Sequence, residues 1–117
     1  MSNIRFFEAT TWCKDTYATK MNKEDFKKWL EEEEYYYDKI EEVSQDKLVL
    51  SGVFDDDDET IKNRLKKYEY ECEEGDFITI DEYVYKMISY KEFLDYCVKN
   101  NYKFENPTLI ASDSGIV

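Results

Sequence analysis

Hydrophobic and polar positions along the chain follow two periods, one typical of strands and one typical of helices. Aromatic and β-branched residues dominate Asn3–Cys13, which predicts a strand, and Thr16–Met21 predicts a second strand. A turn at Lys14-Asp15 would join them, so we expect these two segments to pair as a hairpin. Lys47–Phe54 is again mostly apolar and predicts a further strand.

The segment Lys23–Val43 predicts one long amphipathic helix. Asn22 is a good N-cap, and Asp25 follows at the capping-box position. The positions that then recur at spacings of three and four are apolar apart from Glu33; they are Phe26, Trp29, Leu30, Glu33, Tyr36, Tyr37 and Ile40. The opposite face carries the acidic residues Glu31, Glu32, Glu34, Asp38, Glu41 and Glu42.

A short helix and a strand are predicted in the middle of the chain. Asp56 or Asp57 can cap a helix over Asp58–Lys67. In Tyr68–Glu73, tyrosine and cysteine alternate with glutamate, a period of two that predicts a strand with one acidic face. Glu74-Gly75-Asp76 then predicts a hairpin turn.

The last third of the chain predicts a strand followed by a second main helix. Phe77–Met87 has strand character, with a bulge or break near Glu82 where the alternation changes face. Ser89-Tyr90-Lys91-Glu92 fits the capping box, and we expect the helix to end at Asn100-Asn101. Phe104 should pack back onto the core.

Together these segments predict an α+β fold with one antiparallel sheet of about four to five strands and two main helices packed on it. Residues 1–107 are expected to form a single acidic domain. Pro107 ends any helical continuation. Residues 108–117 are expected to form either a C-terminal edge strand or a flexible tail.

The distribution of charge along the chain indicates what kind of partner the protein binds. The chain has 28 acidic and 16 basic residues, a net charge of −12. Residues 1–30 carry a net +2, residues 31–82 a net −14 and residues 83–117 a net zero. Such a balance argues against direct binding of nucleic acid or of an anionic membrane, and it favours a basic protein partner.

The acidic side chains have a spacing that suits such a partner. Residues four apart in a helix rise about 6 Å and residues two apart in a strand about 6.6 Å, both close to the spacing of phosphates along one DNA strand. Interleaved tyrosines would add contact area of the kind found in interface hot spots. The predicted contact residues are Glu31, Glu34, Tyr35, Tyr36, Asp38, Asp55, Asp56, Asp57, Asp58, Glu69, Glu71 and Glu73.

Catalytic and metal-binding signatures are missing from the sequence. It has no histidine, which removes the commonest general base and most zinc ligand sets, and it has no Gly-rich phosphate loop. The run Asp55–Glu59 does not fit an EF-hand, because Thr60 stands where that loop needs glycine. We therefore predict a protein that is not an enzyme and that uses no metal or cofactor.

Cysteine usage and hydropathy predict a cytoplasmic protein. Cys13, Cys72 and Cys97 are odd in number and widely spaced, which is typical of reduced thiols. The first residues lack the apolar segment of a secretory leader, and no stretch approaches the roughly 20 apolar residues of a membrane span.

In composition alone, the chain resembles the small acidic inhibitors that phages and mobile elements direct against defence nucleases, the DNA-mimicking anti-CRISPR and antirestriction proteins. The shared traits are small size, strong negative charge, many tyrosines and few prolines. The resemblance implies a non-enzymatic inhibitor that acts in the host cytoplasm on a CRISPR effector or a restriction enzyme. The alternative is a general acidic interaction or regulatory domain that binds through a hydrophobic or sheet-edge surface.

Overall fold

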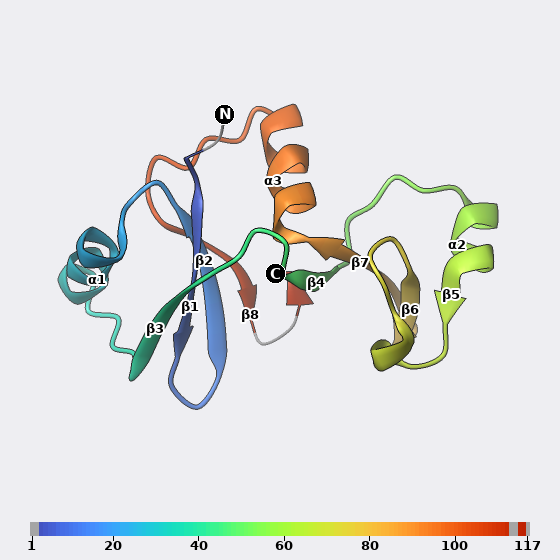
Figure 1. Ribbon diagram of the computed structural model, residues 1–117, viewed down its shortest axis with the longest axis horizontal. Coiled ribbons are helices and arrows are strands. Elements are labelled where there is room, and N and C mark those ends of the chain that lie inside the picture. Colours follow the sequence, from blue (N-terminus) through green and yellow to red (C-terminus); the bar gives the residue numbers. More distant parts are fainter. Residues whose placement is uncertain (1–2, 113–114, 117) are drawn as a thin grey trace.

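The computed structural model describes residues 3–112 and 115–116, and the predicted α+β class is confirmed (Figure 1). The elements of the described residues are, in order, β1 (Arg5–Thr10), β2 (Lys14–Thr19), α1 (Lys23–Glu32), β3 (Lys39–Val43), β4 (Leu48–Ser51), α2 (Asp58–Arg64), β5 (Leu65–Lys66), the 3-10 turn η1 (Glu69–Glu71), β6 (Phe77–Ile80), β7 (Tyr83–Ser89), α3 (Tyr90–Lys99), β8 (Thr108–Ser112) and β9 (Gly115–Ile116).

The strands form two groups of four, rather than the single sheet of four to five that the sequence predicted. The first group has the order β3-β1-β2-β8, and the second has the order β4-β7-β6-β5. The two-residue strand β9 pairs with β8 on one side and with β4 on the other, so the groups form one continuous strand order. Figure 1 shows them side by side along the longest axis of the molecule.

Both faces of the first group are covered, and β1 shows why. Successive side chains of a strand point to opposite faces, so Phe6 and Phe7 enter different cores. Phe6 is buried with Leu94 and Cys97 of α3, and its ring stacks on Tyr90 at 4.9 Å between centroids. Phe7 instead stacks on Phe26 of α1 at 5.1 Å. Helices α1 and α3 therefore lie on opposite faces of this group.

The second group has a smaller core, made of Leu50, Ile78 and Met87 with Cys72 and Tyr85 packed against it. Helix α2 contributes no buried residue to it. The helix is held instead by its last residue, because Arg64 makes an ion pair with the buried carboxylate of Asp76, with a distance of 2.9 Å from Nη2 to Oδ1. Helix α2 is therefore held by a polar contact and not by buried apolar side chains.

The predicted helix over Lys23–Val43 is wrong beyond Glu32. The chain turns at Glu34, whose φ of 62° is left-handed, and Lys39–Val43 then forms β3 along the edge of β1. Four consecutive glutamates place negative charge at the helix C-terminus, where the macrodipole disfavours it, and three tyrosines follow that are weaker helix formers than alanine or leucine. Pairing with β1 supplies the backbone hydrogen bonds that a longer helix would have made.

The predicted strand over Tyr68–Glu73 is also wrong. Glu69–Glu71 is a 3-10 turn, and the neighbouring strand β5 pairs in parallel with β6, so Glu74-Gly75-Asp76 is a turn but does not close a hairpin. A true hairpin comes later, where the break predicted near Glu82 occurs. Asp81 and Glu82 both have positive φ, at 50° and 73°, which is typical of a type I′ turn between β6 and β7.

Three helix starts are confirmed. The side chains of Asn22, Asp57 and Ser89 accept hydrogen bonds from the backbone N–H groups at the third helical positions of α1, α2 and α3. The hairpin of β1 and β2 is confirmed as well, with its turn at residues 11–13 and not at Lys14-Asp15. Helix α3 ends as predicted, and Phe104 is buried in the hydrophobic core between α3 and the sheet.

The segment beyond residue 107 contributes strands to the sheet. β8 pairs with β2 on one side and β9 on the other, so it lies inside the strand order and not at an edge. The part of the expected tail at positions 113, 114 and 117 lies outside the described residues.

Candidate protein-binding surfaces

The twelve predicted contact residues lie at the surface but in two separate places. Eleven are exposed and Asp56 is partly buried. We call Glu31, Glu34, Tyr35, Tyr36 and Asp38 the first acidic surface, and Asp55, Asp56, Asp57, Asp58, Glu69, Glu71 and Glu73 the second acidic surface. The first lies at the end of α1. The second extends from the β4–α2 loop beside α3 to α2 and η1, toward the opposite end of the molecule in Figure 1.

The first acidic surface surrounds a shallow pocket of about 270 Å³ between α1 and β3. Four of its five residues line this pocket; the exception is Glu34. Tyr36 is 74% exposed, while the ring of Tyr35 packs against Trp29 at 6.2 Å between centroids. The structure therefore brings two carboxylates and two tyrosines together here, beside Lys27 and Lys39, although not on the helix face that the sequence predicted.

A hydrogen-bonded tyrosine pair fixes the loop that carries this surface. The hydroxyl of Tyr37 donates to Oδ2 of Asp15 at 3.0 Å and lies 2.7 Å from the hydroxyl of Tyr17. Burial, together with these hydrogen bonds, raises the pKa of Tyr37 well above its ordinary value, so the ring stays neutral. The backbone N–H of Asp38 also donates to the carbonyl of Thr10. The loop is thereby tied to β1 and β2.

The second acidic surface is built on the ends of short elements. Asp57 caps α2, and its pKa is lowered because it accepts hydrogen bonds from Thr60. Glu69 and Glu71 belong to η1, beside an exposed stack of Tyr68 on Tyr70 with centroids 5.4 Å apart and ring planes 6° apart. Glutamate and tyrosine therefore project together from a tight turn, in place of the predicted strand ladder.

Most carboxylates of the two acidic surfaces make no ion pair with any described residue. Asp56 makes an ion pair with Lys86, at 2.9 Å between Nζ and Oδ2. Within the part of the chain that the structure describes, none of the other acidic residues of either surface takes part in an ion pair. Their charge remains available to a partner.

The excess charge divides between the two ends of an elongated molecule. Residues 20–46 hold ten acidic and five basic side chains, a net of −5, and residues 55–86 hold twelve acidic and five basic ones, a net of −7. The principal extents of the backbone are 46, 32 and 20 Å. The acidic excess is thus not one contiguous patch but two regions along the longest axis (Figure 1).

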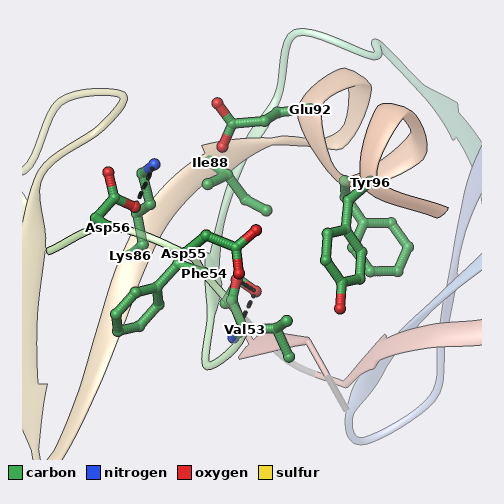
Figure 2. A pocket seen from close by; sticks show the side chains of 10 residues that line it. Val53, Phe54, Asp55, Asp56, Lys86, Ile88, Glu92 and Tyr96 are labelled. Atoms are coloured by element: carbon green, nitrogen blue, oxygen red, sulfur yellow. Dashed lines mark hydrogen bonds and ion pairs between the residues drawn. The ribbon is translucent and has the colours of Figure 1, made fainter. Parts of the chain in front are cut away.

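A larger pocket, of about 400 Å³, opens between α3 and the loop that leads from β4 to α2 (Figure 2). It is lined by Asp55 and Asp56 of the second acidic surface and by residues that were not among the predicted contact residues, including Phe54, Glu92, Phe93 and Tyr96. Their spacing in the sequence gave no signal, because the pocket forms only when α3 packs beside β4 and β7.

One exposed aromatic residue was also missed. Trp12 is 94% exposed at the tip of the β1–β2 hairpin. Trp12 falls within the predicted strand Asn3–Cys13, because tryptophan favours strands. A tryptophan left in water at a turn is unusual for a side chain of this size, since burial of its surface is strongly favourable.

The described residues contain no group of three or more His, Cys, Asp or Glu side chains arranged to hold a metal ion. Cys72 and Cys97 have raised pKa values, mainly because burial disfavours their thiolates, so neither thiol is activated. Among the described residues, no helix is long and apolar enough to cross a membrane. No protein-family model, curated protein or solved structure matches this chain.

Proposed function

We propose that this protein is a non-enzymatic inhibitor that binds a basic, nucleic-acid-binding protein of the cytoplasm and occupies its nucleic-acid site. A phage-encoded or mobile-element inhibitor of a CRISPR effector or restriction enzyme would act in this way. The observation that carries the proposal is the exposure of two acidic surfaces whose carboxylates are, with the exception of Asp56, free of ion pairs among the described residues.

The density of charge supports the proposal. A net charge of −12 over a length of 46 Å gives about one net charge per 3.8 Å. Measured along the helix axis, one strand of DNA carries one phosphate per roughly 3.4 Å. Averaged over its length, the protein would therefore offer a cleft that binds a nucleic-acid strand a similar amount of charge, gathered in the two acidic regions, with exposed tyrosines where a strand would offer its bases.

Salt dependence and competition test the proposal. The protein is immobilised, incubated with bacterial lysate at low salt and eluted with duplex DNA, and the eluted protein is then purified and its affinity measured at several salt concentrations. We expect elution by DNA and a steep fall in affinity with salt, because binding depends on many charge contacts. Binding that neither DNA nor salt weakens would contradict it.

A matched pair of charge reversals makes the test specific. One variant combines Glu31→Lys, Glu34→Lys and Asp38→Lys, which reverses the charge of the first acidic surface. The control reverses three exposed acids outside both surfaces, Asp46, Asp95 and Glu105, and leaves the same net charge. We expect only the first variant to lose binding. Equal losses would indicate that total charge, and not these surfaces, governs the interaction.

A second candidate function is an interaction domain that binds through apolar side chains, with its acidity serving solubility. Exposure of Trp12 favours it, since tryptophan is enriched among hot-spot residues of protein interfaces. In that case Trp12→Ala would abolish binding, and charge reversal would leave binding largely intact.

A further inference from the structure

We propose that the pocket beside α3 holds an arginine side chain of the partner protein. This inference rests on the proposed function, because it names the group that one part of the second acidic surface recognises. The pocket's volume of about 400 Å³ is ample for a single long side chain.

The pocket has an apolar interior with aromatic walls. Buried Ile88 lies in it, and Phe93 and Tyr96 project from α3. On the other side stand Val53 and Phe54, which precede the acidic run. In Figure 2 the side chain of Asp55 extends into the space between Phe54 and Tyr96. A bound group would therefore meet ring faces and methyl groups as well as charge.

The charges at its rim are not balanced. Asp56 is already paired with Lys86, and the two opposite charges cancel. Asp55 and Glu92 are exposed, and neither makes an ion pair with any described residue. Three acids and one lysine line the pocket, a net of −2, which is complementary to a cation.

A guanidinium suits this combination better than other cations. It is planar, is weakly hydrated, stacks on aromatic rings and donates hydrogen bonds to carboxylates in its own plane. A lysine ammonium is more strongly hydrated and would lose more solvation against Phe93 and Tyr96. A divalent metal needs several converging oxygen ligands, and the described residues contain no such group.

The test is a titration of the full-length ¹⁵N-labelled protein with the peptide acetyl-Gly-Ser-Arg-Ser-Gly-amide, followed by NMR. Peptides with lysine or with uncharged citrulline in place of arginine serve as comparisons. We expect shifts centred on Val53, Phe93 and Tyr96, roughly fivefold tighter binding of the arginine peptide than of the lysine peptide, and no binding of the citrulline peptide. Equal binding of all three, or shifts elsewhere, would overturn the inference.

Conservative variants give the second arm. Asp55→Asn and Glu92→Gln preserve shape, and glutamine is also accepted at the capping-box position of α3. Each should weaken the arginine peptide about threefold, and both together about tenfold, while the control Glu105→Gln leaves binding unchanged. A well-dispersed spectrum of each variant shows that it is folded. Unchanged affinity of the folded double variant would overturn the inference.

The two proposals can fail separately, because the peptide titration involves no nucleic-acid-binding protein. If the peptide does not bind but DNA still displaces the captured partner, the pocket is not an arginine site and the inhibitor proposal stands. If the peptide binds as expected but DNA displaces nothing, the pocket recognises arginine in a partner that does not bind nucleic acid at the same place.

Discussion

Arg64 and Asp76, twelve residues apart, join the end of α2 to the start of β6 by a hydrogen bond and an ion pair that share one carboxylate oxygen. Both Nε and Nη2 of the guanidinium lie 2.9 Å from Oδ1. The second oxygen, Oδ2, accepts from the backbone N–H of Glu73. Asp76 is 4% exposed, so this contact anchors the otherwise unburied helix α2.

Replacement of Asp76 by asparagine should therefore destabilise the protein by about 1–3 kcal/mol, because a buried acceptor is replaced by an amide that cannot accept at both positions. Chemical denaturation measures the free energy of unfolding. Asp95→Asn, at an exposed position of α3, is the control and should change the free energy of unfolding by less than about 0.5 kcal/mol. Equal stability of the two variants would contradict the anchoring role.

The same carboxylate predicts a pH dependence. Burial opposes its ionisation, but the N–H of Glu73, the guanidinium of Arg64 and the ammonium of Lys66 outweigh burial and lower its pKa. Because the folded pKa lies below the unfolded value of about 3.9, its stabilisation is complete above roughly pH 5 and is lost as the pH falls through the folded pKa. Unfolding curves of wild type and Asp76→Asn should therefore converge in acid. A constant gap down to pH 2 would contradict this.

The turn after α1 predicts a stabilising substitution. Glu34 has φ of 62°, a conformation that glycine adopts without strain. Glu34→Gly should be about 1 kcal/mol more stable than Glu34→Ala, and both variants lose the same charge. Thermal unfolding of the pair isolates the backbone effect. A more stable alanine variant would mean that the helix continues through this position.

The core beneath α1 predicts a large loss of stability. Phe26 is fully buried between Phe7 and Tyr17, with ring centroids at 5.1 and 5.3 Å. Phe26→Ala should cost about 3–5 kcal/mol, a large part of the stability of a domain this size, whereas Phe26→Leu should cost less because it leaves a smaller cavity. Denaturant midpoints measure both. Losses below 1 kcal/mol for the alanine variant would place α1 outside the core.

Trp12 should behave in the opposite way. Its truncation to alanine should change the free energy of unfolding by less than about 0.5 kcal/mol, because the indole contributes little buried surface. Acrylamide should quench the fluorescence of Trp12 strongly and that of the half-buried Trp29 weakly. The variant Trp12→Phe, in which Trp29 is the remaining tryptophan, separates the two contributions. Weak quenching of Trp12 would indicate that the hairpin tip is covered in solution, for instance by a second copy.

Sequence reasoning succeeded where the signal is local. The capping residues Asn22 and Ser89 act on backbone groups three positions away, so their neighbours alone predict the starts of α1 and α3. The end of α3 is similar, since Asn101 adopts a left-handed φ of 60°, which asparagine tolerates.

The sequence predicted the wrong element where pairing between strands far apart in the chain decides the conformation. Ile40 and Val43, three residues apart, fit a helical repeat. In β3, however, their side chains point to different faces of the sheet, and the two residues pair with Ala9 and Phe6 of β1, respectively. Ile40 packs against the core under α1 and Val43 against the core under α3. A strand covered on both faces needs an apolar residue on each, and its pattern can therefore imitate a helix.

The candidate surfaces were predicted as residues but not as an arrangement. Composition shows that the middle of the chain holds the excess charge, since exposure of charged side chains is the rule. It does not show that α1 with β3 and α2 with η1 would lie at opposite ends. The pocket with Glu92 and Tyr96 could not be predicted, because its walls come from segments that are about 40 residues apart in the chain.

The division of charge between the two ends affects the orientation in which a partner protein first encounters this one. Net charges of −5 and −7 on either side of a nearly neutral centre give a field dominated by the total charge, with only a small dipole. At a distance, such a field attracts a cationic protein but scarcely turns it. Since the Debye length of about 8 Å at physiological ionic strength is far shorter than the 46 Å of the molecule, each end acts alone. First encounters should therefore occur in two competing orientations, and productive docking should be selected only after contact.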